Sequence, residues 1–71
     1  TKQDFLRKIG KNIQKARKAK GYTQESFAEK VNLSWSYISK VESGVLNMSC
    51  SKIYDFASYL EVPVQELLSL E

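Results

Sequence analysis

The chain has 71 residues, of which 42% are hydrophobic, and a net charge of +3. A chain this short buries only about 60% of its unfolded surface, which predicts one small domain, residues 1–71, and its hydrophobic fraction excludes a disordered protein. It has one cysteine and no histidine, so an internal disulfide is impossible and a metal site is not expected. The single cysteine fits a reduced setting, so we expect a cytoplasmic location, and no membrane-spanning run or signal peptide is visible.

The first predicted helix covers about residues 3–20 and ends at Gly21. Its hydrophobic residues recur at the spacing of one helical face: Phe5, Ile9, Ile13 and Ala16. Residues 1–20 carry eight cationic side chains against one acid, whereas residues 21–71 carry three against seven. This asymmetry favours a polyanionic partner, but a solvated lysine-rich face explains the charge alone equally well.

Residues 23–44 predict two short helices, 24–31 and 35–42, joined by a tight turn. Thr23 and Ser34 are suited to cap them, because a side-chain oxygen at that position accepts a free backbone N–H. Asn32 tolerates the left-handed conformation that ends a helix, and Gly44 ends the second one. The buried faces are expected at Phe27, Ala28, Val31, Ile38 and Val41. This order of elements is typical of a helix-turn-helix.

Two more helices are predicted at about residues 50–60 and 64–70. Ser49 is suited to cap the first, and Pro63 suits the start of the second. Cys50 is expected to be a small buried residue in an inner row that continues at Ile53, Ala57 and Leu60. The sequence thus predicts an all-α fold with five helices.

An ordered set of residues extends over about positions 9–68: Ile9, Gly10, Ile13, Arg17, Gly21, Thr23, Gln24, Phe27, Ala28, Val31, Leu33, Ser34, Tyr37, Ile38, Ser39, Glu42, Gly44, Ala57, Leu60, Val62, Leu67 and Leu68. This set resembles the phage-repressor-like helix-turn-helix proteins of the Cro/XRE family. The resemblance implies a compact five-helix, lambda-repressor-like DNA-binding domain. Asn32 and Glu61 stand where the family usually has glycine, and Glu61 would be mildly strained in a left-handed conformation.

The predicted helix 35–42 has a polar face opposite Ile38, suited to a major groove about 12 Å wide. The candidate base-reading residues are Trp35, Ser36, Ser39 and Lys40. Trp35 has the family's base-reading position and could pack on a thymine methyl group or a sugar. The alternatives are an ordinary solvent-exposed face and, for Trp35, a place at the flank of the core.

The resemblance also implies a phosphate contact by Gln24, where the amino end of a helix favours an anion. Three further residues are expected to bond the sugar–phosphate backbone of DNA: Tyr37, Ser43 and Asn47. By the same resemblance, we expect an ion pair between Arg17 and Glu42 that ties the first helix to the third. The alternative is that both side chains face water.

Family members usually bind two-fold symmetric operators as homodimers. The predicted helix 64–70 has more hydrophobic surface than one face of a small core can hide: Val64, Leu67, Leu68 and Leu70. We expect these four residues to form the dimer interface. The alternative is that all four cover the core.

The sequence therefore predicts a regulator of transcription that binds double-stranded DNA by sequence, similar to small phage repressors and to controller proteins of restriction–modification systems. The alternative is a protein-interaction module with the same fold, such as an antitoxin or a detached regulator domain, but no partner-binding tail is visible. An enzyme is not expected, because the residues of nucleophile and metal sites are missing. We also expect no cofactor and no small-molecule ligand.

Overall fold

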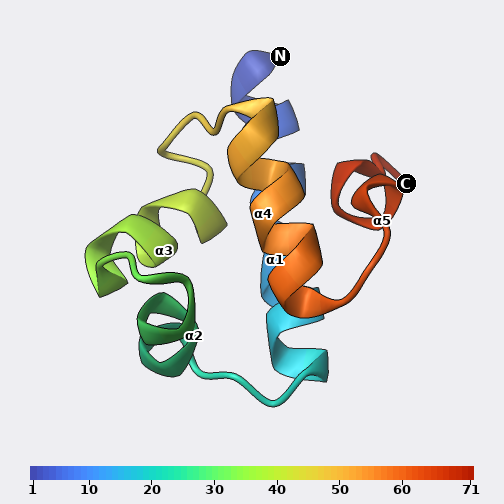
Figure 1. Cartoon of the computed structure of the whole chain (residues 1–71). Coiled ribbons are helices and arrows are strands. Elements are labelled where there is room, and N and C mark those ends of the chain that lie inside the picture. Colours follow the sequence, from blue (N-terminus) through green and yellow to red (C-terminus); the bar gives the residue numbers. More distant parts are fainter.

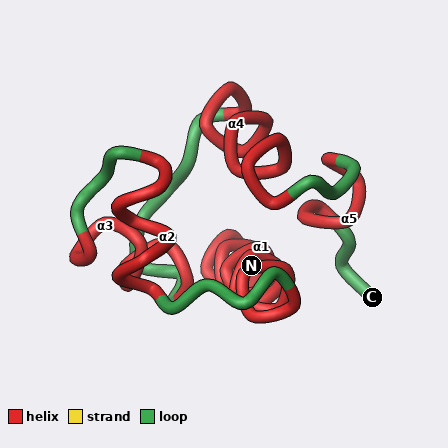
Figure 2. The backbone as a smooth tube through the Cα atoms, turned by 60° about the horizontal axis from the view of Figure 1, so that its bottom comes forward, coloured by secondary structure: helices red, strands yellow, loops and turns green.

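The computed structural model describes residues 1–71 and contains five helices (Figure 1). Their bounds are α1 Lys2–Ala19, α2 Gln24–Val31, α3 Trp35–Glu42, α4 Cys50–Leu60 and α5 Val64–Leu68. α1 and α4 lie next to each other, with α2 and α3 on one side and α5 on the other (Figures 1 and 2). The predicted all-α fold with five helices is confirmed.

Four of the five helices begin at polar side chains that accept backbone N–H groups, and α5 begins after Pro63 with no such bond. α1 begins one residue earlier than predicted, because Thr1 and Asp4 form a capping box. The three predicted caps of α2, α3 and α4 are present, each accepting the N–H of the third residue inside its helix: Thr23 from Ser26, Ser34 from Tyr37, and Ser49 from Lys52. Each cap satisfies a donor that has no partner within the helix.

Two helices end at non-glycine residues in the left-handed conformation. Asn32 follows α2 with φ 59°, as the sequence predicts, and Glu61 follows α4 with φ 58°. An asparagine tolerates this conformation, but for a glutamate it costs about 1–2 kcal/mol. The carboxylate of Glu61 forms an ion pair with Lys20, just beyond the end of α1.

The last helix is shorter than predicted. α5 ends at Leu68 instead of residue 70, and the backbone of Ser69 is extended. The side-chain amide of Asn12 on α1 donates to the carbonyl oxygens of Leu67, at 2.9 Å, and Ser69, at 2.6 Å. These bonds satisfy carbonyls that another turn of helix would otherwise have used, and they fix the carboxyl-terminal segment on α1.

A core of twelve residues lies between the helices: Ile9, Ile13, Ala16, Phe27, Ala28, Ile38, Val41, Ile53, Phe56, Ala57, Leu60 and Leu67. The rings of Phe27 and Phe56 meet edge to face with centroids 5.2 Å apart. This contact joins α2 to α4, while α3 packs on α1. Both helices of the helix-turn-helix are therefore attached to the rest of the fold.

The structure corrects three expectations about burial. Phe5 and Cys50 are exposed, not buried. Both lie in the first turn of a helix, where side chains are tilted toward the amino end and therefore extend past the neighbouring helices. Leu67 is fully buried in the core and cannot form a dimer interface, whereas Leu68 and Leu70 are 39% and 61% exposed.

Candidate nucleic-acid interface

The outer face of α3 carries the residues that the sequence assigned to base reading. Ile38 is fully buried on the core side of this helix. On the outer side Trp35, Ser36 and Lys40 are exposed, and Ser39 is half-buried. Trp35 has 54% of its surface exposed, so it is not a core residue. The structure therefore leaves three exposed side chains on this face, with Ser39 at its margin.

The residues assigned to the DNA backbone differ in what they can still donate. Tyr37 is half-buried, and this burial raises the pKa of its phenol above 10.0, so the O–H donor is present at neutral pH. The hydroxyl of Ser43 already donates to the carbonyl oxygen of Lys40 at 3.1 Å. Ser43 would have to give up that bond to donate to a phosphate. Asn47 is exposed in the segment between α3 and α4.

Arg17 of α1 and Glu42 at the end of α3 form a buried ion pair. Nε of Arg17 lies 2.6 Å from Oε2 of Glu42, and Nη2 lies 3.1 Å from Oε1. Their side chains are only 6% and 2% exposed. The remaining arm of the guanidinium donates from Nη1 to the carbonyl oxygen of Tyr22 at 2.8 Å. Two parallel bonds between planar groups fix both distance and angle, so the pair sets the position of α3 on α1.

Gln24, the first residue of α2, joins this ion pair to the surface. Its Nε2 donates to Oε1 of Glu42 at 3.0 Å, and its Oε1 accepts from Nε1 of Trp35 at 3.2 Å. The sequence assigned Gln24 to a phosphate only, and these two contacts were missed. They connect residues 11 and 18 positions apart, and no local spacing signals such a contact. One N–H of the amide remains for an external acceptor.

The amino-terminal half of α1 contacts Gly44, two residues after the end of α3. The side chain of Gln3 donates to the carbonyl oxygen of Gly44 at 3.2 Å. Gly44 has φ +78°, and a Cβ there would lie 2.7 Å from Cγ of Arg7. Only glycine suits both the conformation and the space. The end of α3 is therefore held by backbone contacts as well as by the ion pair.

Most of the positive charge of the chain lies on α1 and not on α3. Four lysines of α1 recur at the spacing of one helical stripe, on the side away from Ile9: Lys8, Lys11, Lys15 and Lys18. α3 itself has a single cation, Lys40. The favourable field on the outer face of α3 therefore depends on Lys40 and on the amino end of α2, where unpaired backbone N–H groups and the helix dipole attract an anion.

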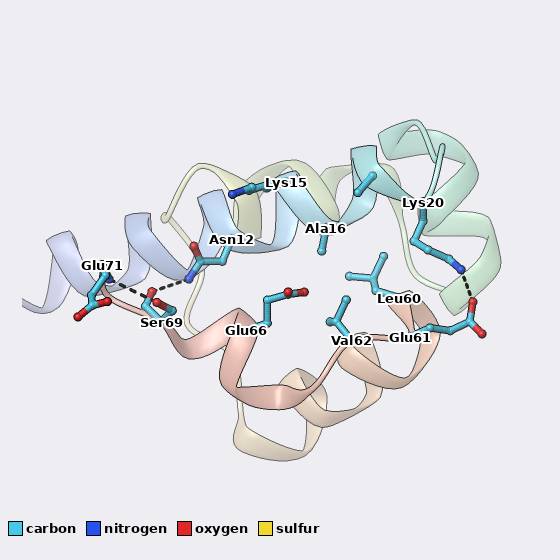
Figure 3. A pocket seen from close by; sticks show the side chains of 11 residues that line it. Asn12, Lys15, Ala16, Lys20, Leu60, Glu61, Val62, Glu66, Ser69 and Glu71 are labelled. Atoms are coloured by element: carbon cyan, nitrogen blue, oxygen red, sulfur yellow. Dashed lines mark hydrogen bonds and ion pairs between the residues drawn. The ribbon is translucent and has the colours of Figure 1, made fainter.

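A hollow of about 350 Å³ lies on the other side of α1, between α1, the end of α4 and α5 (Figure 3). Lys20 and Glu61 pair at one end of it, and Asn12 holds Ser69 at the other. The hydrogen bond and the charge of Lys20 lower the pKa of Glu61 below its usual 4.5, and Glu61 raises that of Lys20.

Nowhere do three or more histidine, cysteine, aspartate or glutamate side chains gather in a way that could hold a metal ion. None of the five helices combines the length and the hydrophobicity needed to cross a membrane.

Comparison with known proteins identifies the arrangement of α2 and α3. Residues 13–67 match the family model described as helix-turn-helix. The chain is 40% identical over 58 residues to YazB of Bacillus subtilis (strain 168), an uncharacterized HTH-type transcriptional regulator, covering 82% of this chain and 84% of that protein. It is 33% identical over 67 residues to the control protein C.MunI of a Mycoplasma species, covering 93% and 90%.

A solved structure agrees with these relatives. The crystal structure of the restriction–modification controller protein C.AhdI from Aeromonas hydrophila matches with a TM-score of 0.80 and 37% sequence identity, over 87% of this chain and 94% of that chain. Both the sequence and the fold therefore point to the same group of proteins. The chain belongs to the helix-turn-helix family of DNA-binding transcriptional regulators of the Cro/XRE type.

Proposed function

We propose that the chain binds a two-fold symmetric operator as a homodimer and regulates transcription by occupying that site. The observation that carries this proposal is the outer face of α3. It is polar and exposed at Ser36 and Lys40, and the buried pair of Arg17 and Glu42 holds it rigidly. A helix presented in this way fits a major groove about 12 Å wide. The similarity to the control protein C.MunI and to the restriction–modification controller protein C.AhdI supports the regulatory role.

Roles on the DNA follow from what each side chain can donate. Lys40 and Ser36 are proposed to read base edges, since lysine donates to guanine O6 and N7 and serine is permissive. Ser39 is proposed as a secondary reader because it is half-buried. The free N–H of Gln24 and the amino end of α2 are proposed to hold one phosphate. Further backbone contacts are assigned to Tyr37, Ser43 and Asn47.

The proposed dimer surface is the exposed part of the carboxyl-terminal region. Leu68 and Leu70 are exposed, and Val64 is half-buried. Leu70 shares a shallow hollow with Phe5, which extends the hydrophobic patch onto the start of α1. A homodimer on a two-fold symmetric operator needs its two α3 helices in major grooves about 34 Å apart, or a multiple of that distance.

The test is selection of bound sites from random duplexes, followed by titration of the recovered site at several salt concentrations. The expected result is an inverted repeat that binds at least about 10³-fold more tightly than random DNA. A single half-site would contradict the homodimer. No preference for any sequence would contradict the operator, and would favour the protein-interaction module instead.

A further inference from the structure

The amide of Gln24 lies between two groups of opposite hydrogen-bonding character. The carboxylate of Glu42 can only accept, and the indole N–H of Trp35 can only donate. The observed orientation, with Nε2 at Glu42 and Oε1 at Trp35, satisfies both. A flipped amide would place its oxygen against a carboxylate and its N–H groups against another N–H. The carboxylate of Glu42 therefore determines which way the amide faces.

Glu42 is itself held in one position. Both of its oxygens are bonded to Arg17, and Oε1 also accepts from Gln24. No buried side-chain nitrogen or oxygen in the chain lacks a partner. Because this charged group is only 2% exposed, its orientation is set by these bonds and not by contact with solvent. A continuous series of bonds thus runs from Arg17 through Glu42 and Gln24 to Trp35.

This series decides which part of Trp35 faces outward. Nε1 is the only polar atom of an indole, and it points back to Gln24. Because this donor is already bonded, the exposed part of the residue, which is 54% exposed overall, offers ring hydrocarbon and no unbonded donor. Trp35 is the first residue of α3, the end of a recognition helix that contacts bases. At this position the chain offers a flat hydrophobic edge and no free donor.

We propose that Glu42 is a positioning residue for DNA recognition. Acting through Gln24, it holds the Trp35 ring edge against the 5-methyl group of a thymine in each half-site. The proposal rests on the proposed DNA-binding function. Thymine is the assigned base because its methyl group is the only hydrophobic group that base edges present in the major groove. A free indole N–H would favour an acceptor, such as guanine O6 or N7, but here that N–H is already bonded.

The positioning role is tested first without DNA. Trp35 is the only tryptophan, so its indole N–H gives one signal in a nitrogen–proton NMR spectrum. Gln24→Met removes both bonds at nearly constant size, and should shift this signal upfield and speed its exchange with solvent severalfold. Ser36→Ala is the matched control, because Ser36 is an exposed neighbour on α3, and it should leave the signal unchanged.

The role of Glu42 needs a variant that still folds. Removing Glu42 alone leaves Arg17 buried without a partner, but replacing a whole buried ion pair with hydrophobic residues is often neutral for stability. Arg17→Met/Glu42→Met should therefore fold and shift the indole signal in the same direction as Gln24→Met, but by less, because the Gln24 amide remains and only its fixed orientation is lost. A folded double variant with the wild-type indole signal would overturn the positioning role. Circular dichroism and the remaining NMR signals establish that the variant is folded.

The thymine contact is tested on the selected site. Each thymine is replaced in turn by deoxyuridine, which lacks only the methyl group. One replacement in each half-site should weaken wild-type binding by about fourfold per methyl group, the effect of one buried methyl. Trp35→Ala should abolish this sensitivity, and Gln24→Met should reduce it. Normal binding with no effect of deoxyuridine would overturn the thymine contact alone, whereas absence of binding to any duplex would also overturn the proposed function.

Discussion

Gly10 of α1 lies directly against the backbone of Glu42 at the end of α3. A Cβ built at Gly10 would be 2.5 Å from the carbonyl oxygens of Val41 and Glu42. Real Cβ atoms do not approach a backbone oxygen so closely, so the two helices can meet at this distance only because residue 10 has no side chain. Because Glu42 also belongs to the buried ion pair, this approach and the pair depend on each other.

Gly10→Ala is therefore expected to destabilise the fold by about 1–2 kcal/mol, the upper part of the net range. In a helix interior alanine is more favourable than glycine by about 1 kcal/mol. Forcing an extra carbon into a packed interface costs about 1–3 kcal/mol, and here both obstructing atoms belong to the backbone and cannot rotate away. Urea unfolding measures the difference. Lys11→Ala, at the exposed neighbouring position, is the control and should change stability by less than about 0.5 kcal/mol. Equal stability of the two variants would contradict the close approach.

Glu42→Ala is expected to cost about 3–5 kcal/mol of unfolding free energy, because it leaves the guanidinium of Arg17 buried without its partner. The double variant Arg17→Met/Glu42→Met should be clearly more stable than Glu42→Ala, since no unpaired charge remains. Unfolding in urea at one pH compares the two. A Glu42→Ala variant as stable as the wild type would show that the pair contributes nothing to the fold.

Lys40→Ala should weaken binding to the selected site by about 1–3 kcal/mol and weaken binding to random DNA much less, as expected for a base-reading lysine. Asn47→Ala, at a proposed backbone contact, should weaken both by similar factors. Parallel titrations on the two kinds of duplex, at one salt concentration, distinguish these effects. If the two variants behave alike, the division between base readers and backbone contacts is incorrect.

Replacing both Leu68 and Leu70 with lysine should weaken self-association while leaving the fold intact, because these side chains are exposed in the single chain. Leu67→Ala should instead cost about 2–5 kcal/mol of stability, since Leu67 is fully buried. Sedimentation equilibrium measures the first effect, and urea unfolding measures the second. Unchanged association of the lysine variant would place the dimer contact on another surface.

The ion pair of Lys20 and Glu61 predicts a pH-dependent contribution to stability. Lys20 lowers the pKa of Glu61 in the folded chain below its usual 4.5, so the unfolded chain takes up this proton first as the pH falls. The contribution is therefore fully present above about pH 4.5 and is lost as the pH drops through the lowered value. It is also lost at high pH, as Lys20 titrates through a pKa raised above 10.5.

Glu61→Gln tests this prediction, because it keeps the left-handed backbone and side-chain size but cannot carry the charge. The difference in stability between the wild type and Glu61→Gln should be largest near neutral pH and should vanish at about pH 2. It should also shrink in high salt, since the pair is at the surface. A difference that persists unchanged in acid would assign the effect to something other than the ion pair.

The sequence by itself determined where α2, α3 and α4 begin and end, whereas the end of α5 depends on the bonds from Asn12 of α1. Thr23 and Ser34 cap helices by bonding a backbone N–H only three residues away, and Asn32 ends α2 through its own backbone preference. Such interactions are local, so they can be recognised without knowing how the helices pack. Hydrophobic spacing also identified most of the core, because the period of a helix decides which side chains share a face.

Only the tertiary structure decided which of several similar residues are buried and which side chains from different helices contact one another. Leu67 is buried and Leu68 is exposed because α5 packs on α1 with one face, and two adjacent leucines cannot share it. The bonds from Gln24 to Glu42 and Trp35 likewise require the start of α2 to lie within reach of side chains from both ends of α3. Such contacts depend on the distances and angles between whole helices, which the packing of the entire chain sets and no short stretch of sequence encodes.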